Sequence, residues 1–315
     1  MRSPSYIPAW LLATVVVFGC GTAPPEEADE RGPEPSAGSP ADVAPTEPAA
    51  RGSQEESAPT PVTEEGLRAA LKRANPGLGD EVGVAGDGRA ILAVEAHDRN
   101  LKDITPLRGL PLVALDLART AVEDLEPLRG MPLRELYLED TPVNDLGPLK
   151  GAPLEKLYLS QTKVADLGAL ETAVHLKELN LVDAKVSDLS PLAGLPQLEM
   201  LWLTGCPVEN IASLARVRSL VSLTLEKTKV KDLSPLEGHP LLRLHIGETP
   251  ITDLTPLRSM HLTRLIFTPG RIEKGIEHAR NMRTLRELGT EFSDPRVRPP
   301  MPPSEFWAKY DAGAL

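Results

Sequence analysis

The sequence predicts an α/β solenoid with a parallel sheet on its concave side. A repeat of about 21 residues, L-x-x-L-x-L-x-x-T-x-V-x-D-L-x-P-L, returns eight times between about Ile91 and Thr284. Inside each repeat, apolar residues first alternate as in a half-buried strand, and too few residues remain for a long helix. Because stacked repeats form one continuous core, we expect function to reside on a surface rather than in a deep pocket.

The strand of each repeat opens on an apolar residue that is followed, three and five places later, by two more. Leu115 with Leu117 and Leu136 with Leu138 are such pairs. This spacing buries alternate side chains of a short strand. The opening residues are Leu112, Leu133, Leu154, Leu176, Leu198, Leu220, Leu241 and Leu262.

The second half of each repeat supplies two further core columns. One column is β-branched and comprises Val122, Val143, Val164, Val186, Val208, Val230, Ile251 and Ile272. The other is a Leu or Ile directly after an acidic or amide residue, as in Asp124-Leu125 and Asn210-Ile211. We expect both columns to fill the core between coils.

The return limb carries a hydroxyl residue before proline in Thr105-Pro106, Ser190-Pro191, Ser234-Pro235 and Thr255-Pro256. This pair predicts a hydroxyl N-cap with proline at the first helical position. About seven residues remain before the next strand, so 3₁₀ or one-turn helices are expected on the convex side.

These residues resemble the leucine-rich repeat family, and the T-x-V-x-D-L-x-P-L tail is similar to its short internalin-type subclass. The resemblance covers roughly two thirds of the chain and implies a horseshoe. It says little about function, because this scaffold binds many unrelated partners. Leu71–Gly77 and Phe306–Gly313 also resemble the flanks of modules fused to bacterial serine/threonine kinases, but the kinase motifs are absent: His97-Asp98-Arg99-Asn100 is no catalytic loop.

Residues 1–20 resemble a lipoprotein export signal. Arg2 precedes a ten-residue apolar run, Ala9–Phe18, which is too short to span a bilayer and ends at Gly19-Cys20. Lipidation of Cys20 would anchor the protein at a membrane of the bacterial cell envelope, either in the periplasm or at the surface. Ordinary cleavage after Ala23 is the alternative, although a proline would then follow the cut.

Residues 21–61 are predicted to be a disordered tether rich in Pro, Glu and Ala. They hold nine carboxylates against Arg31 and Arg51, and too little apolar surface to offset the entropy of folding. Of the net charge of −11, the tether therefore accounts for −7 (2 − 9). The remainder is only mildly acidic, which argues against nucleic acid as a partner.

Both ends of the solenoid require caps. In the N-terminal cap, 62–90, Thr63–Asn75 is predicted to form a helix that buries Leu67, Ala70 and Leu71. Glu81–Val94 is predicted to form a hairpin with a glycine-rich turn. The repeats are assigned to 91–284.

At the other end, Glu273–Arg283 is expected to form a longer helix, and the C-terminal cap is assigned to 285–315. There Ser304 is expected to cap a last helix whose aromatic residues, Phe306, Trp307 and Tyr310, cover the final coil. An exposed docking motif is the alternative for these three residues.

No catalytic, cofactor or metal site is predicted. The six histidines are scattered, and neither H-E-x-x-H nor a phosphate loop occurs. The recurring aspartates are expected to accept hydrogen bonds from turn backbone; they are Asp103, Asp124, Asp145, Asp166, Asp188, Asp232 and Asp253. Cys206 occupies a column otherwise held by threonine, which is expected to bond backbone between coils, and is predicted to be a buried thiol.

The outward positions of the strands are the candidate binding surface. One column reads Asp116, Tyr137, Tyr158, Asn180, Trp202, Thr224 and His245, and its neighbour reads Ala114, Glu135, Lys156, Glu178, Met200, Ser222 and Arg243. Exposed aromatic residues are enriched at binding hot spots. The residues predicted to bind a partner are Tyr137, Tyr158, Asn180, Trp202, His245, Glu135 and Lys156.

The sequence thus favours a non-catalytic lipoprotein that binds a protein through its concave face. Three alternatives stay open. The first is that the aromatic residues stack only on one another. The second is that they bind cell-wall carbohydrate, and the third is that the aspartate row forms an enzyme site.

Overall fold

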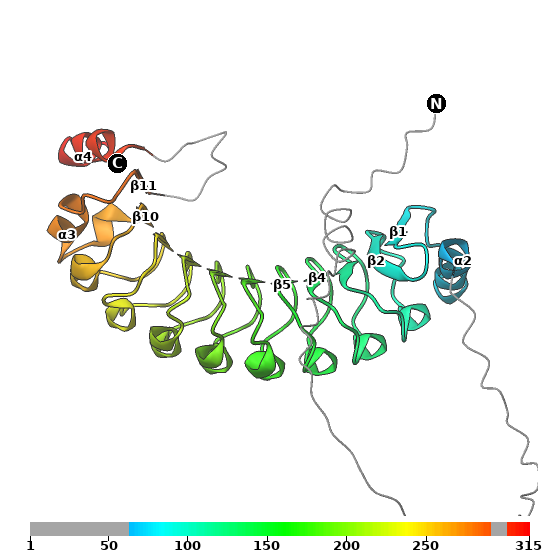
Figure 1. Cartoon of the computed structure of the whole chain (residues 1–315). Helices are drawn as coiled ribbons and strands as arrows, with labels where there is room; N and C mark the ends of the chain where they lie inside the picture. Colours follow the sequence, from blue (N-terminus) through cyan, green and yellow to red (C-terminus); the bar gives the residue numbers. More distant parts are fainter. Residues whose placement is uncertain (1–62, 291–300) are drawn as a thin grey trace, which may run out of the picture.

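The computed structural model describes residues 63–290 and 301–315. These residues form a curved solenoid with a strand sheet on its concave side and short helices on its convex side (Figure 1). The predicted signal, Cys20 and the tether lie outside the described residues.

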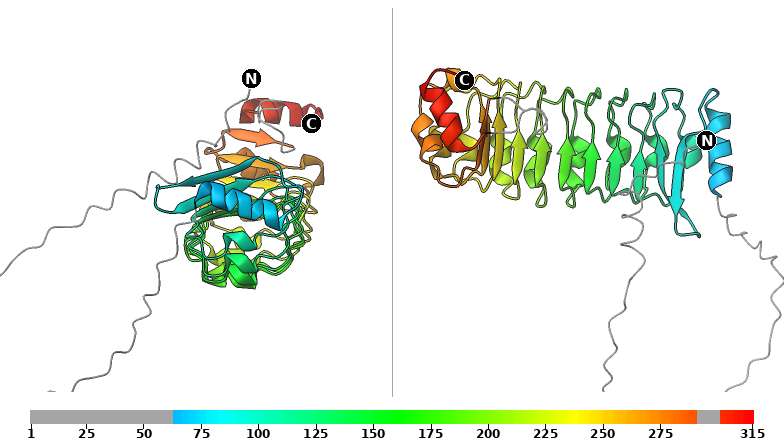
Figure 2. Two further views of the ribbon diagram at one scale, coloured as in Figure 1. Left: turned by 90° about the vertical axis from the view of Figure 1, so that its right-hand side faces the viewer. Right: turned by 90° about the horizontal axis from the view of Figure 1, so that it is seen from above.

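Eleven strands form one sheet in chain order, and the view from above shows them side by side (Figure 2). Among the strands of the described residues, only β1 and β2 pair antiparallel; the other neighbouring strands pair in parallel, with the repeats in register. The fold class predicted from the repeat is confirmed. The strands are β1 Val82–Gly86, β2 Ile91–Ala96, β3 Ala114–Asp116, β4 Glu135–Tyr137, β5 Lys156–Tyr158, β6 Glu178–Asn180, β7 Met200–Trp202, β8 Ser222–Thr224, β9 Arg243–Ile246, β10 Arg264–Phe267 and β11 Glu287–Gly289.

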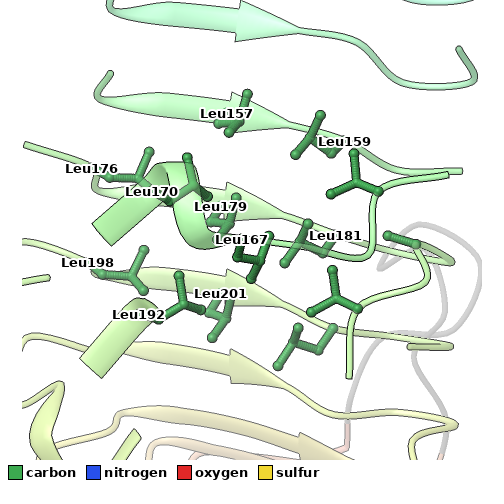
Figure 3. Close-up of a cluster of buried hydrophobic side chains, with 14 of the residues drawn as sticks. Leu157, Leu159, Leu167, Leu170, Leu176, Leu179, Leu181, Leu192, Leu198 and Leu201 are labelled. Carbon is green, nitrogen blue, oxygen red and sulfur yellow. The ribbon is translucent and has the colours of Figure 1, made fainter. Parts of the chain in front are cut away.

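The core is a ladder of leucines between coils. Leu157, Leu179 and Leu201 lie at the centres of successive strands, and each is at most 1% exposed. Leu170 and Leu192 reach the same core from the convex side (Figure 3). The β-branched column is also buried, except that Ile272 in the last repeat is only partly buried.

The convex limbs are 3₁₀ helices, as the short return limb predicted. They are η1 Thr105–Leu107, η2 Glu126–Leu128, η3 Gly147–Leu149, η4 Gly168–Thr172, η5 Ser190–Gly194, η6 Ala212–Arg216, η7 Ser234–Leu236 and η8 Thr255–Ser259. A further 3₁₀ helix, η9 (Pro269–Arg271), lies in the turn after β10, and α3 (Ile276–Arg280) packs on η8 in the last coil.

The predicted hydroxyl caps are wrong. Ser190 is the first helical residue rather than the cap, and no side-chain cap bond is made by the preceding Leu189. The aspartate two places upstream accepts instead: Asp188 Oδ1 receives the Ser190 N–H at 2.8 Å. Equivalent bonds of 2.7–2.8 Å recur at Asp103, Asp124, Asp145, Asp166, Asn210, Asp232 and Asp253. The turn role expected for the aspartate row is confirmed.

The threonine column also differs from expectation, because each hydroxyl bonds within its own coil. Thr162 Oγ1 donates to the Leu159 carbonyl at 2.8 Å, and Thr120, Thr141, Thr228 and Thr249 do the same three residues back. Only Cys206 in this column reaches the neighbouring coil, with its thiol 3.0 Å from the Leu181 carbonyl. Cys206 is buried as predicted, and burial raises its pKa to about 12.

A left-handed residue precedes this column in seven successive coils. Gly205 has φ 74°, and the equivalent non-glycine residues have φ of 53–61°: Arg119, Asp140, Gln161, Asp183, Lys227 and Glu248. L-residues adopt this conformation at a cost of about 1 kcal/mol or more. The tight turn out of the strand therefore carries backbone strain in most coils.

The N-terminal cap begins with the predicted helix, α2 (Glu64–Ala74), whose first turn is capped by Thr63. Leu67 and Leu71 are buried, but Ala70 is only partly buried. Asn75, at the end of α2, is 4% exposed and joins the cap to the first coil. Its Nδ2 donates to the Leu71 and Asp103 carbonyls at 3.0 and 2.7 Å. Its Oδ1 accepts the Lys102 and Asp103 N–H groups at 2.9 and 2.7 Å.

At the other end, the helix expected over Glu273–Arg283 is shorter: α3 spans Ile276–Arg280. Gly275, with φ 76°, precedes it in a left-handed conformation that sets where the helix begins. The last helix, α4 (Pro303–Asp311), starts after Pro302, so Ser304 lies inside the helix and is not its cap.

The aromatic residues of α4 pack against the last coil. Phe306 is fully buried and lies 5.6 Å from Phe267 of β10 between ring centroids. Trp307 is 9% exposed, and its ring is covered by the Arg280 guanidinium at 4.8 Å. The covering role predicted for these residues is confirmed. Among the described residues, no helix is long and apolar enough to cross a membrane.

Candidate binding surface on the concave sheet

Two outward columns of side chains run across the concave sheet because the strands pair in register. Tyr137 of β4 pairs with Tyr158 of β5, and Tyr158 pairs with Asn180 of β6. Asn180 in turn pairs with Trp202 of β7. In the neighbouring column, Glu135 of β4 pairs with Lys156 of β5. The structure therefore brings six of the seven predicted binding residues onto four adjacent strands.

The aromatic residues form a ladder on these strands. The ring centroids of Tyr137 and Tyr158 are 5.0 Å apart, and those of Tyr158 and Trp202 are 6.1 Å apart, although Asn180 separates their strands. All three are partly buried. The aromatic residues thus do stack on one another, and the part of each ring that remains exposed belongs to one shared surface.

Polar contacts hold the ladder in place. Tyr158 Oη donates to Glu178 at 2.6 Å and Tyr137 Oη donates to Glu135 at 3.2 Å. Lys156 Nζ lies between these carboxylates, at 3.4 Å from Glu135 and 4.0 Å from Glu178. Burial, reinforced by the adjacent carboxylates, raises the pKa of both tyrosines. The phenols are therefore neutral at pH 7, and the ladder is ordered before any partner binds.

Asn180 is oriented by its own coil and the preceding one. Its Oδ1 accepts from Ser160 Oγ at 2.8 Å and from the Val182 N–H at 3.1 Å. Both contacts fix the carbonyl end of the amide against the protein. The amide nitrogen is thereby held as a donor on the same face as the rings.

His245 of β9 lies in the same outward column but is only 4% exposed. Burial, and to a lesser extent the charge of Lys227, lowers its pKa to about 4. It is neutral at pH 7 and offers little surface to a partner. It lines a shallow hollow of about 190 Å³ together with Trp202, Arg243, Arg264 and Ile266. Small-molecule pockets usually measure about 300–1,000 Å³, so this hollow fits a side chain better than a whole ligand.

A polar cluster that the sequence reasoning missed lies at the N-terminal end of the concave face. His97 Nε2 is 2.9 Å from Asp116 Oδ1, and His97 Nδ1 is 3.6 Å from Glu95 Oε1. The hydrogen bond to Asp116 is the main cause of a raised His97 pKa, whereas burial raises the pKa of Glu95. Glu139 is also partly buried, which raises its pKa, and Asp116 contributes in the same direction. The period-2 pattern of β2 was the available signal, since it places Glu95 and His97 on one face.

Comparison with known proteins supports the solenoid. Residues 174–216 match the family model described as Leucine Rich repeats (2 copies). No curated protein matches the chain. Among solved structures, an internalin C2 from Listeria monocytogenes is 25% identical with a TM-score of 0.55, over 64% of this chain and 92% of that one. An internalin (inlF) from the same organism is 22% identical with a TM-score of 0.55, over 71% and 66%.

Proposed function

Because this chain is a leucine-rich repeat protein with internalin-like repeats, we propose that it binds a protein partner, without catalysis, through the concave sheet. The binding surface is the aromatic ladder of Tyr137, Tyr158 and Trp202 with its flanking Asn180, Glu135 and Lys156. We further propose that lipid on Cys20 anchors the protein at a bacterial membrane, with the tether between anchor and solenoid.

The ladder itself is the observation that supports this proposal. The same column holds Asp116 in β3 and Thr224 in β8, so the fold does not require an aromatic residue there. Three aromatic side chains nevertheless gather on four adjacent strands, partly exposed and already ordered. Preordered aromatic side chains lose little conformational entropy on binding, which is why they dominate hot spots.

Site-specific photo-crosslinking in the native host tests the proposed face. A benzophenone amino acid replaces Lys156 on the concave face or, as the matched control, Glu171 on convex η4. We expect one protein to be captured through position 156 and not through position 171. Capture of the same protein from both positions, or only from the convex one, would contradict binding through the concave face.

The purified partner then allows a measurement of affinity. Removing the Trp202 side chain with Trp202→Ala should weaken binding by about 2 kcal/mol or more, or roughly 30-fold, if it is a hot spot. Glu171→Ala should leave the affinity unchanged. Circular dichroism of both variants controls for folding.

Cell-wall carbohydrate is the second candidate, because aromatic rings beside carboxylates also suit sugar rings. Calorimetry with soluble peptidoglycan fragments distinguishes it. Saturable binding that is lost in Trp202→Ala, with no protein captured at position 156, would replace the protein partner with a carbohydrate.

The proposed anchor has its own test. Cys20→Ala should move the protein from the membrane fraction to the soluble fraction or leave its signal uncleaved. Detergent-dependent membrane association that persists in this variant would overturn the proposed lipidation.

A further inference from the structure

The cluster at the N-terminal end of the concave face converges around a small residue. Glu95 and Asp116 are register partners on β2 and β3. The parallel pairing of β3 with β4 continues beyond the ends of these strands, since the Arg119 N–H donates to the Glu139 carbonyl at 2.7 Å. Extended by two residues, this register places Ala118 between His97 and Glu139. Alanine there leaves room above the sheet for the longer side chains around it.

One ligand-type atom from each of Glu95, His97 and Asp116 lies within 4.8 Å of the others. The Asp116 side chain is 11% exposed, Glu95 19% and His97 28%, so the cluster is sheltered but open to solvent on one side. Glu95 and Asp116 lie on two adjacent strands of the sheet, and His97 directly follows the last residue of β2. Such placement favours a fixed set of ligands over an accidental contact.

Glu139, beside the cluster, has a carboxylate oxygen that lacks a hydrogen-bond partner in the described part of the chain. Its Oε2 is buried without a hydrogen-bond partner among the described residues. Its electrostatic neighbours include Asp116, His97 and Arg119. A buried carboxylate oxygen without a partner is costly unless a cation is close by.

We propose that Glu95, His97 and Asp116 bind a divalent transition-metal ion such as Zn²⁺, with the Glu139 carboxylate beside it. One imidazole nitrogen with carboxylate oxygens is a donor set that suits zinc and related ions. Two zinc ligands at about 2.1 Å from the ion lie about 3.4 Å apart in tetrahedral geometry. The His97–Asp116 pair therefore opens by only about half an ångström when a metal replaces the proton between them.

The proposal is tested by titrating the full-length chain with ZnCl₂ in a calorimeter. We expect a high-affinity event, with a dissociation constant of about 10 µM or lower. His97→Ala and Asp116→Asn should each weaken it by more than about tenfold. His175→Ala, which removes an exposed histidine elsewhere in the solenoid, is the matched control and should retain it. All proteins keep Cys20, so any zinc bound by its thiol is common to every titration.

Two further measurements separate a metal site from a histidine that merely pairs with carboxylates. Co²⁺ should give a visible absorption band in the wild-type protein that is absent in His97→Ala. Zinc should also shift the His97 ring ¹⁵N resonances, while those of His175 stay in place. Equal zinc affinity in wild type and His97→Ala, binding only at millimolar zinc, or unchanged His97 resonances would each overturn the proposal.

Discussion

Asn75 is predicted to be the polar residue that couples the N-terminal cap to the first coil. All four hydrogen-bonding positions of its buried amide are used, and three of the four bonds reach Lys102 and Asp103, far along the chain. Replacing it in Asn75→Ala should therefore destabilise the cap specifically, with little direct effect on distant coils.

The size of the effect follows from which groups lose their partner. In Asn75→Ala the Leu71 carbonyl still accepts the backbone N–H of residue 75, a bond of 2.9 Å in the wild type. The Lys102 N–H, the Asp103 N–H and the Asp103 carbonyl lose their partner. An unsatisfied buried group costs about 1 kcal/mol or more, so the expected loss is about 3 kcal/mol, or about 2 if water enters the space. Asn100→Ala is the control, because the side-chain bond of Asn100 to the Gly77 carbonyl is exposed; this variant should lower the free energy of unfolding by less than about 1 kcal/mol.

Urea unfolding of the full-length chain measures the total change, and hydrogen exchange shows where it falls. Because each coil contacts mainly its neighbours, protection should be lost in α2, β1 and β2 before β9 and β10. A loss in Asn75→Ala no larger than in Asn100→Ala would refute the coupling. A uniform loss of protection along the solenoid would refute its local character.

Three further predictions follow from the core, the turns and the buried histidine. Leu201→Ala should lower the free energy of unfolding by about 2 to 5 kcal/mol because it leaves a cavity. Asp166→Ala removes one exposed turn bond and should lower it by about 1 kcal/mol or less in the same urea assay. Equal losses would show that the core and turn columns are misassigned. Gln161→Gly should be neutral or slightly stabilising, because glycine adopts the φ of 59° at this position without strain. Gln161→Val should lower the melting temperature. The reverse order of the two variants would exclude strain at this turn. The pKa of His245 is about 4 in the folded protein, against an ordinary value of 6.5. The neutral ring therefore favours the folded state above pH 6.5, and this stabilisation, up to about 3 kcal/mol, is lost as the pH falls from 6.5 toward 4. The stability of His245→Gln should depend less on pH in that window, and an unchanged pH profile would contradict the burial argument.

The sequence predicted most reliably the core and turn columns that recur in successive coils. Leu201, Val164 and Asp166 were assigned correctly because each belongs to a column that recurs every coil. The capping role given to Ser190 was wrong because Asp188 accepts both the N–H and the hydroxyl of Ser190, so Ser190 becomes the first residue of the helix. No periodicity marks Asn75, whose partners lie 27 and 28 residues away.

The candidate binding surface was likewise predicted only in part. Alternation along the strands predicted that Tyr137, Tyr158 and Trp202 point outward. It could not predict that Trp202 reaches Tyr158 past Asn180, since that depends on side-chain rotamers. It also could not predict that His245 is buried, because the residues around it come from different coils.

The turn bonds of the aspartate and threonine columns are self-contained, and this has a consequence for how the molecule can vary. Asp166 and Thr162 each satisfy backbone groups of their own coil. Neighbouring coils therefore interact largely through leucine packing and strand pairing. A whole coil could thus be duplicated or lost without breaking the turn bonds of its neighbours. Such changes would lengthen or shorten the concave face in steps of about 4.8 Å, the spacing of adjacent strands. The distance between the aromatic ladder and either end of the sheet can then evolve separately from the ladder itself.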